Sequence, residues 1–323
     1  MASPNGVLGP QTMWLVLAAA AAGVLAMQMF QPSVPPEEPR AEITVGEGEK
    51  AQVVRLNRRE CLSKNNRIWA VIDNGVECIA YAAAGQPSGS AITLVYFSGD
   101  IPASQLGERT QTAMREFYAR RAAELAQRHD LPVIVVGRPG TMGSSGYHLT
   151  GGRSDEAKVL ASALDALKDK YGMRRLALAG QSGGARVIAQ LMVMGRNDIR
   201  CAAMASGAYG LPRLVGGGTT RTNIFGNPGS RYLVPLNNAD SIVHDPQRRS
   251  FIIGDRRDQR TPFTEQQEWA EKLRNLGHHS VLIEAVAKGS EHHGLSSQAL
   301  LAGALCAKGR SDAEIGSAVV AAH

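Results

Sequence analysis

One short stretch in the middle of the chain constrains the fold more than any other part of the sequence. Residues 176–179 are an apolar run typical of a buried strand, and the residues after Gly184 have the apolar periodicity of a helix. Between them lies Gly180-Gln-Ser182-Gly-Gly184, a Gly-x-Ser-x-Gly pattern. Glycines on both sides of the serine allow the strand and the helix to pass each other closely. The stretch therefore predicts a nucleophile elbow with Ser182 at its tip.

Strands and helices alternate along the rest of the chain. Asn74-Gly75 is a strong two-residue hairpin signal, and the later apolar runs are nearly continuous. This pattern predicts an α/β fold with a mostly parallel sheet covered by helices on both faces. Strands are expected at residues 50–58, 67–73, 76–81, 91–97, 132–136, 174–179, 199–206, 251–254 and 280–285. Helices are expected at residues 104–129 and 154–170, after the elbow, from Pro262 with Thr261 as its cap, and after His293.

Composition and motifs exclude several classes of function. The net charge of +6 comes with scattered arginine pairs and no aromatic-interleaved basic stripe, so a nucleic-acid partner is disfavoured. The sequence contains neither Cys-x-x-Cys nor His-Glu-x-x-His, so no metal site is expected. The glycine-rich loop at residues 137–146 lacks the spacing of a phosphate-binding P-loop, and Arg138 within it is expected to anchor the loop. We therefore expect no cofactor.

The N-terminus differs in composition from the rest of the chain. Residues 13–27 are apolar and uncharged, which suits a signal peptide better than a span of about 17–25 residues. No lysine or arginine precedes this segment, so an uncleaved membrane anchor stays open. We expect a signal peptide or anchor at 1–30, a proline-rich linker at 31–48, a catalytic-type domain at 49–310 with a small lid at 209–248, and a tail at 311–323. The protein is thus expected to be exported, either periplasmic or secreted, or membrane-anchored.

The chain also contains four cysteines: Cys61, Cys78, Cys201 and Cys306. An even number of cysteines in an exported chain favours disulfides, with three possible connectivities. The short-loop option, Cys61–Cys78, would stabilise the fold by about 3 kcal/mol.

Candidate partners for Ser182 follow it in the sequence, an acid first and then a base. The acid candidates, Asp255 and Asp258, come directly after the strand at 251–254. The base candidates, His292 and His293, come after the final strand, in Gly289-Ser-Glu-His-His-Gly-Leu. Spacing from Gly289 favours His292, whereas His-Gly-Leu at the entry to a helix favours His293.

Residues 67–308 resemble the α/β-hydrolase superfamily. The resemblance rests on the chain order of serine, acid and histidine and on the motifs Gly-Gln-Ser-Gly-Gly and His-Gly-Leu. Within this superfamily the chain is most similar to esterases and peptidases related to prolyl oligopeptidase and dienelactone hydrolase. The resemblance implies a Ser-His-Asp triad. Its acid lies three residues before a Thr-Pro pair, which selects Asp258 and leaves Asp255 as second choice. His293 is preferred as base over His292.

The resemblance also implies an activity. Ser182 would form an acyl-enzyme, and backbone N–H groups of Gly183 and Asp100 would hold the oxyanion. We expect cleavage of carboxylic esters or acyl bonds of small substrates. A prolyl oligopeptidase-like serine peptidase is the alternative, disfavoured because the chain leaves no room for the propeller or cap of such enzymes. A catalytically silent binding protein on the same fold is the alternative of another class.

Overall fold

The computed structural model describes residues 38–45, 52–102, 105–148, 154–210 and 233–322. The chain divides into two units, Met1–Glu38 and Pro39–His323. The predicted signal or anchor segment lies outside the described residues, and no helix among the described residues is long and apolar enough to span a membrane.

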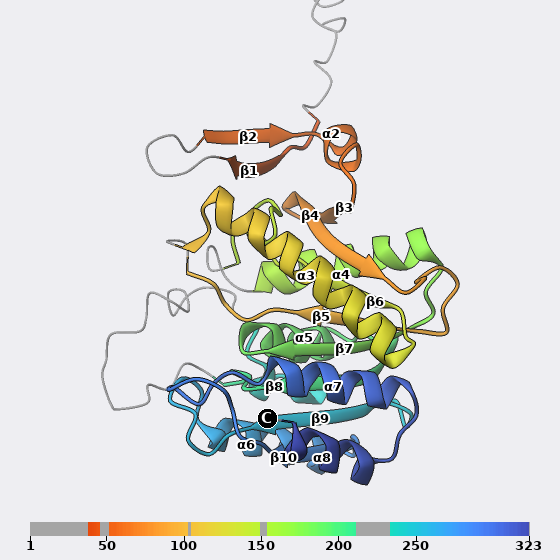
Figure 1. Cartoon of the computed structure of the whole chain (residues 1–323), viewed down its shortest axis with the longest axis vertical. Helices are drawn as coiled ribbons and strands as arrows, with labels where there is room; N and C mark the ends of the chain where they lie inside the picture. The colour runs from red at the N-terminus through yellow and green to blue at the C-terminus, as the bar shows by residue number, and fades with distance from the viewer. Residues whose placement is uncertain (1–37, 46–51, 103–104, 149–153, 211–232, 323) are drawn as a thin grey trace, which may run out of the picture. The chain divides into compact units, whose positions relative to one another are not determined.

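The second unit is built on an eight-stranded sheet with the order β10-β9-β8-β7-β5-β6-β4-β3 (Figure 1). Pairing is parallel from β10 to β6, whereas β4 pairs antiparallel with both β6 and β3. The expected mostly parallel sheet is therefore confirmed. The strands are β3 (Arg67–Ile72), β4 (Gly75–Ala84), β5 (Ile92–Phe97), β6 (Val133–Val136), β7 (Arg175–Gln181), β8 (Ile199–Ala205), β9 (Arg249–Gly254) and β10 (Ser280–Glu284).

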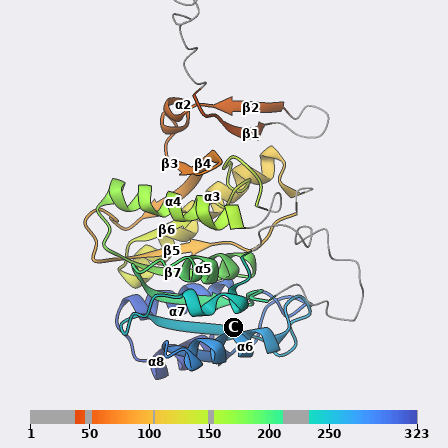
Figure 2. The same ribbon diagram turned by 180° about the vertical axis from the view of Figure 1, so that it is seen from behind.

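Helices cover both faces of this sheet. Figure 1 shows α3 and α7 on the near face, and Figure 2 shows α4 and α5 on the other. The helices are α3 (Glu108–His129), α4 (Ser154–Tyr171), α5 (Gly183–Val193), α6 (Phe263–Asn275), α7 (Ser296–Ala307) and α8 (Asp312–Ala321). Two apolar clusters result, one on each face of the sheet.

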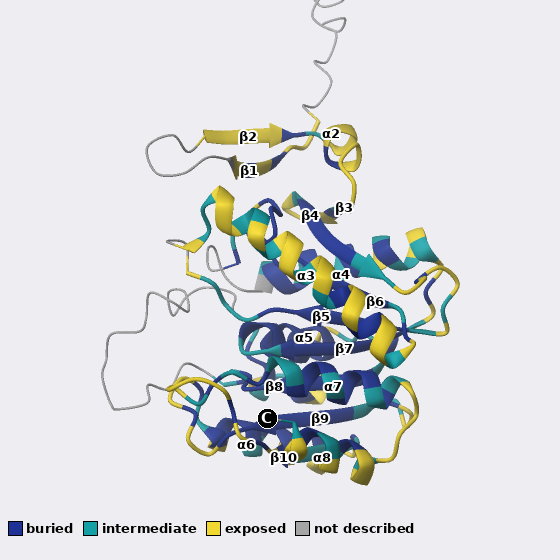
Figure 3. Cartoon of the chain, viewed as in Figure 1, coloured by how far each residue is buried: buried dark blue, intermediate teal, exposed yellow. Residues whose placement is uncertain are grey.

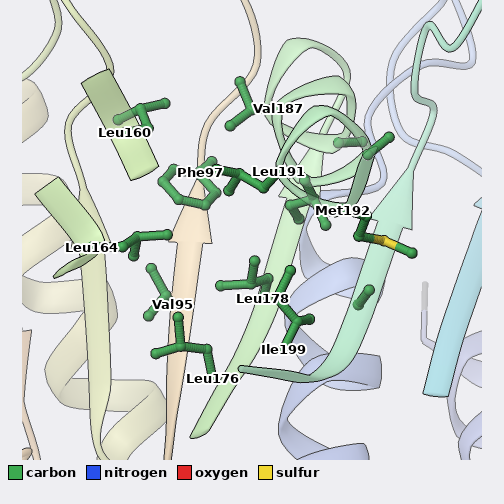
Figure 4. Close-up of a cluster of buried hydrophobic side chains, with 14 of the residues drawn as sticks. Val95, Phe97, Leu160, Leu164, Leu176, Leu178, Val187, Leu191, Met192 and Ile199 are labelled. Carbon is green, nitrogen blue, oxygen red and sulfur yellow. The ribbon is translucent and has the colours of Figure 1, made fainter. Parts of the chain in front are cut away.

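The central strands are apolar along their length because both of their faces are covered. All five interior residues of β7 are buried, and Figure 3 shows β7, β8 and β9 as the buried middle of the sheet. Figure 4 shows Leu178 of β7 between Val95 of β5 and Ile199 of β8, with Leu191 and Met192 of α5 in the same cluster. Burying side chains of this kind stabilises the fold by about 1.5–3 kcal/mol each. The strand that leads to Ser182 is therefore rigidly held.

The N-terminal part of the domain differs from the sequence prediction. The strand expected at 50–58 is β2 (Gln52–Leu56), and it ends where Asn57 caps the helix α2 (Arg58–Leu62) in a capping box with Glu60. Its partner β1 (Ala41–Val45) lies in the stretch predicted as a linker. The prolines of the predicted linker all lie before residue 40, and Ala41, Ile43 and Val45 have the alternation of a strand that the linker prediction missed.

The C-terminal segment is also structured. Residues 311–323, expected as a tail, contain α8, which begins in a capping box between Ser311 and Glu314. Ile315 and Val319 of this helix are buried against the α3–α7 side of the core. The fold therefore extends beyond residue 310, and the Ser-x-x-Glu pattern was the signal for it.

Only part of the predicted lid at 209–248 can be described. Residues 211–232 lie outside the described residues. Residues 233–248 form two short 3-10 turns, Pro235–Asn237 and Ala239–Ser241, with Val234, Ala239 and Ile242 buried. This part of the segment packs on α5 and contributes to the core.

Two disulfides join distant parts of the domain. Cys61–Cys78 links α2 to β4, and Cys201–Cys306 links β8 to α7. Of the three connectivities left open by the sequence, the structure has the one with the short-loop pair, and the second bridge joins cysteines with a sequence separation of 105 residues. Disulfides persist in oxidising compartments, which fits the expected export.

Candidate active site

Ser182 lies at a sharp turn between β7 and α5. Its backbone has φ 57° and ψ −119°, a left-handed conformation that costs a non-glycine residue about 1–3 kcal/mol. The turn is possible because its neighbours lack side chains. A Cβ on Gly184 would lie 2.2 Å from the carbonyl oxygen of Phe97, and a Cβ on Gly180 would lie 2.6 Å from the backbone of Gly184. The predicted elbow geometry is therefore present.

The elbow is held by the neighbouring strand as well as by its own helix. The Ser182 N–H donates to the carbonyl oxygen of Ala205 at 2.8 Å, and the Arg186 N–H donates to the Ser182 carbonyl at 3.1 Å. These bonds hold the strained backbone from both sides. The serine side chain is consequently presented at the carboxyl edge of the sheet.

Asp258 and His293 form a buried pair at the same edge. Asp258 follows β9, and His293 lies between β10 and α7. The Nδ1 atom of His293 lies 2.8 Å from Oδ2 and 3.0 Å from Oδ1 of Asp258, and both side chains are buried. A carboxylate in this position requires a proton on Nδ1, so Nε2 keeps the lone pair of a general base.

The carboxylate of Asp258 is held in its ionised form. Burial would raise the pKa of Asp258, but the hydrogen bond from His293 and those from the Thr261 and Arg260 N–H groups outweigh it and lower the pKa. The two backbone bonds measure 3.0 and 2.8 Å, and the Thr261 hydroxyl donates to Oδ2 at 3.0 Å. The group is therefore a fixed negative charge behind the imidazole ring.

The second-choice residues, Asp255 and His292, lie beside each other in a looser arrangement. The His292 Nδ1 atom is 3.5 Å from Asp255 Oδ2 and makes no hydrogen bond within the described part of the chain. The Asp255 carboxylate instead accepts from the Ala287 and Arg257 N–H groups, both at 2.9 Å. Burial would raise the pKa of Asp255, but these bonds outweigh it and lower the pKa. Asp255 thus ties together the loops after β9 and β10.

The two predicted oxyanion donors are neighbours in space. Gly183 is the first residue of α5, where backbone N–H groups have no partner within the helix. The loop after β5 lies against this point. A Cβ on Gly99 would lie 3.3 Å from the Ser182 Cβ, and a Cβ on Gly183 would lie 1.9 Å from Oδ1 of Asp100. The structure therefore brings Ser182, Gly183 and Asp100 together.

Comparison with known proteins gives the same architecture. No family model and no curated protein matches the sequence. Among solved structures, the esterase Pf2001 of Pyrococcus furiosus is 16% identical with a TM-score of 0.50, over 79% of this chain and 90% of its own. Prolyl oligopeptidase B from Galerina marginata is 13% identical with a TM-score of 0.51, over 84% of this chain and 38% of its own. Pyrococcus horikoshii acylaminoacyl peptidase is 12% identical with a TM-score of 0.50, over 78% of this chain and 44% of its own.

The protein has the α/β-hydrolase fold. The fold expected from the sequence is thereby confirmed. In this α/β-hydrolase fold, the loops after β5, β7, β9 and β10 meet at the carboxyl edge of the sheet and carry all the candidate site residues.

Two further residues of this α/β-hydrolase site were not singled out from the sequence. Gln181 donates from Nε2 to the carbonyl oxygen of His293 at 2.9 Å. Thr261, expected as the cap of α6, donates its hydroxyl to Asp258 and lies within 3.1 Å of the Ser206 carbonyl oxygen. The helix begins at Phe263 with Pro262 at the N-cap, because the Thr261 side chain has turned toward the acid. The only sequence signal was position: Gln181 is adjacent to Ser182, and Thr261 lies three residues after Asp258.

The described residues contain no group of three or more histidine, cysteine, aspartate or glutamate side chains arranged to hold a metal ion. The arrangement instead offers a nucleophile on a strained turn, an imidazole oriented by a carboxylate, and backbone donors at a helix N-terminus. These are the parts needed for acyl transfer.

Proposed function

We propose that the protein is a serine hydrolase that cleaves carboxylic esters of small substrates through an acyl-enzyme on Ser182. His293 serves as general base and acid, and Asp258 orients it. One observation carries the proposal. The buried Asp258–His293 pair, at 2.8 Å, belongs to a segment whose backbone is hydrogen-bonded to Gln181, the residue directly before Ser182.

In the first step, Nε2 of His293 takes the hydroxyl proton as Ser182 Oγ attacks the acyl carbon. The carbonyl π electrons move to oxygen, and the resulting oxyanion accepts hydrogen bonds from the Gly183 and Asp100 N–H groups. The positive end of the α5 dipole also favours this charge. The C–O bond to the leaving alcohol then breaks, and His293 returns the proton to the alkoxide.

In the second step, water replaces the alcohol. His293 takes a proton from water as its oxygen attacks the acyl carbon of the acyl-enzyme. The second tetrahedral intermediate collapses, the bond to Ser182 Oγ breaks, and the proton returns to the serine. Asp258 stays ionised throughout and stabilises the imidazolium that forms in each step.

An ester is favoured over a peptide bond as the substrate. The esterase from Pyrococcus furiosus matches this chain over 90% of its own length. The two peptidases match over 38% and 44% of theirs. Peptidase activity of the prolyl oligopeptidase type is therefore the alternative outcome of the substrate test below. We also propose that the protein acts outside the cytosol, where its two disulfides would persist.

The test compares the disulfide-intact wild type with Ser182→Ala in hydrolysis of p-nitrophenyl acetate and in labelling by a fluorophosphonate probe. We expect activity and labelling in the wild type and neither in the variant. Equal rates in the two proteins would overturn the proposal. A panel of esters of increasing chain length beside aminoacyl amides then decides between esterase and peptidase, because faster cleavage of the amides would favour the alternative.

A further inference from the structure

Beside the candidate oxyanion donors lies a cluster of buried charges, formed by Asp100, Arg138, Glu156 and Arg186. The side chains of Arg138, Arg186 and Glu156 are 0%, 1% and 2% exposed, whereas Asp100 is 24% exposed. Arg138 contacts Asp100 at 2.7 Å and Glu156 at 2.5 Å. Arg186 contacts the same two carboxylates at 3.2 and 3.5 Å. Two positive and two negative charges therefore balance in one buried group.

The cluster joins three elements to the loop after β5. Arg138 lies in the loop after β6, Glu156 in the first turn of α4, and Arg186 in the first turn of α5. Burial would lower the pKa of Arg138, but the charges of Glu156 and Asp100 outweigh it and raise the pKa. Arg138 therefore stays charged within the cluster. Desolvating four charges is costly, and an apolar group of similar volume often stabilises a fold at least as well.

Side chains hold the loop after β5 at three nearby points. Arg138 Nη1 donates to the carbonyl oxygen of Ser98 at 3.1 Å. The two arginines hold the Asp100 carboxylate. The Ile101 N–H donates to Nε2 of His148 at 3.0 Å, and His148 Nδ1 donates to the carbonyl oxygen of Pro139 at 2.9 Å. The backbone on both sides of the Asp100 N–H is thus fixed by residues from other elements.

The cluster also sets the charge next to the candidate oxyanion site. A Cβ on Gly183 would lie 1.9 Å from Oδ1 of Asp100 and 2.6 Å from Nη1 of Arg138. A carboxylate so close to Gly183 would repel an oxyanion if it were not neutralised. Arg138 and Arg186 both neutralise the carboxylate, and Arg138 also holds the loop through the Ser98 carbonyl oxygen.

We propose that Arg138 and His148 are positioning residues for the oxyanion site, a role that rests on the proposed serine-hydrolase function. Arg138 neutralises Asp100 and holds Ser98, and His148 holds Ile101. Together they aim the Asp100 N–H at the carbonyl oxygen of the substrate. Neither side chain contacts the substrate or the reacting atoms.

A purely structural role makes a different prediction, and the chain offers a matched control. The side chain of Arg196 is 10% exposed and contacts Asp198 at 2.8 Å and Asp165 at 2.7 Å, at the amino end of β8. Loss of Arg196 breaks a comparable ion pair at the opposite edge of the sheet from Ser182. If the charge cluster serves only the stability of the fold, Arg138→Met and Arg196→Met should behave alike in kinetics.

The experiment measures kcat and KM on p-nitrophenyl acetate, and the affinity for a trifluoromethyl ketone that forms an oxyanion on Ser182. For Arg138→Met we expect kcat to fall on the order of 10²-fold, because a misplaced oxyanion donor costs about that much. KM should change less than about threefold, and trifluoromethyl ketone affinity should fall with kcat. Arg196→Met should retain wild-type kcat and affinity.

Two further variants separate charge from geometry. Adding Asp100→Asn to Arg138→Met removes the unbalanced charge and should recover part of the lost kcat. His148→Gln keeps an acceptor for the Ile101 N–H and should retain more activity than His148→Phe. If Arg138→Met does not fold, Arg138→Lys and the two His148 variants test the proposal instead. Lysine keeps the positive charge but not the planar guanidinium that donates to two groups at once, so kcat of Arg138→Lys should fall about tenfold.

The inference is overturned if the folded Arg138 and His148 variants keep kcat and ketone affinity within about threefold of Arg196→Met. That result leaves the proposed function intact. An inactive wild type that no fluorophosphonate labels contradicts the proposed function itself.

Discussion

The side-chain amide of Gln181 donates a hydrogen bond to the backbone carbonyl of His293 at 2.9 Å, across a sequence separation of 112 residues. The residue directly before Ser182 thus holds the segment that carries the candidate base. The same amide group accepts from the Ser296 hydroxyl at 3.5 Å, a weak contact at the start of α7. Gln181 therefore ties the elbow to the end of the β10–α7 loop that enters α7.

This link predicts a kinetic effect of Gln181→Met, which keeps the size of the side chain and removes its donor. We expect kcat on p-nitrophenyl acetate to fall about fivefold to tenfold, because the net value of one hydrogen bond is about 1 kcal/mol. Gln190→Met is the control, since Gln190 also donates to a backbone carbonyl, that of Leu233, at 2.9 Å. An equal loss of kcat in both variants would contradict the role of Gln181.

The two acid–base pairs should respond very differently to substitution. Asp258→Asn and His293→Ala are expected to lower kcat by about 10⁴-fold, as the loss of an orienting carboxylate does in other triads. Asp255→Asn and His292→Ala should cost far less, because His292 makes no hydrogen bond with Asp255. Steady-state kinetics of the four folded variants checks the ranking. A larger loss of kcat in Asp255→Asn and His292→Ala would assign the roles of acid and base to Asp255 and His292.

Two glycine substitutions should change stability in opposite directions. Gly184→Ala places a Cβ 2.2 Å from the Phe97 carbonyl, so the strand and the helix must separate, and we expect a loss of several kcal/mol. Gly316 lies within α8 with open space around its Cβ position. Gly316→Ala should therefore raise the free energy of unfolding by about 0.5–1 kcal/mol. Urea denaturation at neutral pH measures both effects.

Acid should destabilise the fold first through His148. Burial and the charge of Arg138 lower its pKa to about 4, against the opposing charges of Glu156 and Asp100. The unfolded chain binds a proton near pH 6.5, whereas the folded chain does not until about pH 4. Stability is therefore complete above pH 6.5 and falls by up to about 3 kcal/mol as the pH drops to 4.

Urea titrations at pH 7, 5.5 and 4 measure this loss. His148→Gln should remove most of the dependence in that window. The carboxylates with lowered pKa, such as Asp258, lose their stabilising effect at lower pH, below their ordinary value of 3.8. An unchanged pH dependence in the variant would assign the loss to other groups.

The cysteines should be fully oxidised in the folded protein. Thiol titration of the unfolded, unreduced chain should find no free thiol, and four would contradict both bridges. Reduction should lower stability more through Cys201–Cys306 than through Cys61–Cys78, since the longer loop restrains the unfolded chain more. The loop-entropy values are about 4.7 and 3 kcal/mol. Comparing Cys201→Ala/Cys306→Ala with Cys61→Ala/Cys78→Ala by denaturation tests this order.

Local signals in the sequence were enough for most of the sheet and for the elbow. Continuous apolar runs mark strands covered on both faces, and Asn74-Gly75 marks the β3–β4 hairpin, although Ile72 pairs with Gly75 and the turn residues are Asp73 and Asn74. Local signals failed where pairing is remote. β1 alternates apolar and polar residues over only five positions, Ala41–Val45, and its pairing with β2 crosses residues 46–51. The capping box at Ser311 was present in the sequence, but only packing on α7 and β10 makes α8 part of the domain.

The sequence by itself determined the α/β-hydrolase fold, the position of Ser182 and the two short segments that contain the acid and the base. The resemblance favoured His293 and Asp258, but the sequence could not determine which imidazole faces which carboxylate, because that contact joins two loops far apart in the chain. Only the tertiary structure placed His293 against Asp258 and enclosed Arg138 between Asp100 and Glu156. The physical reason is that apolar periodicity and turn chemistry act over a few residues, whereas ion pairs and hydrogen bonds between loops depend on how the sheet brings distant segments together.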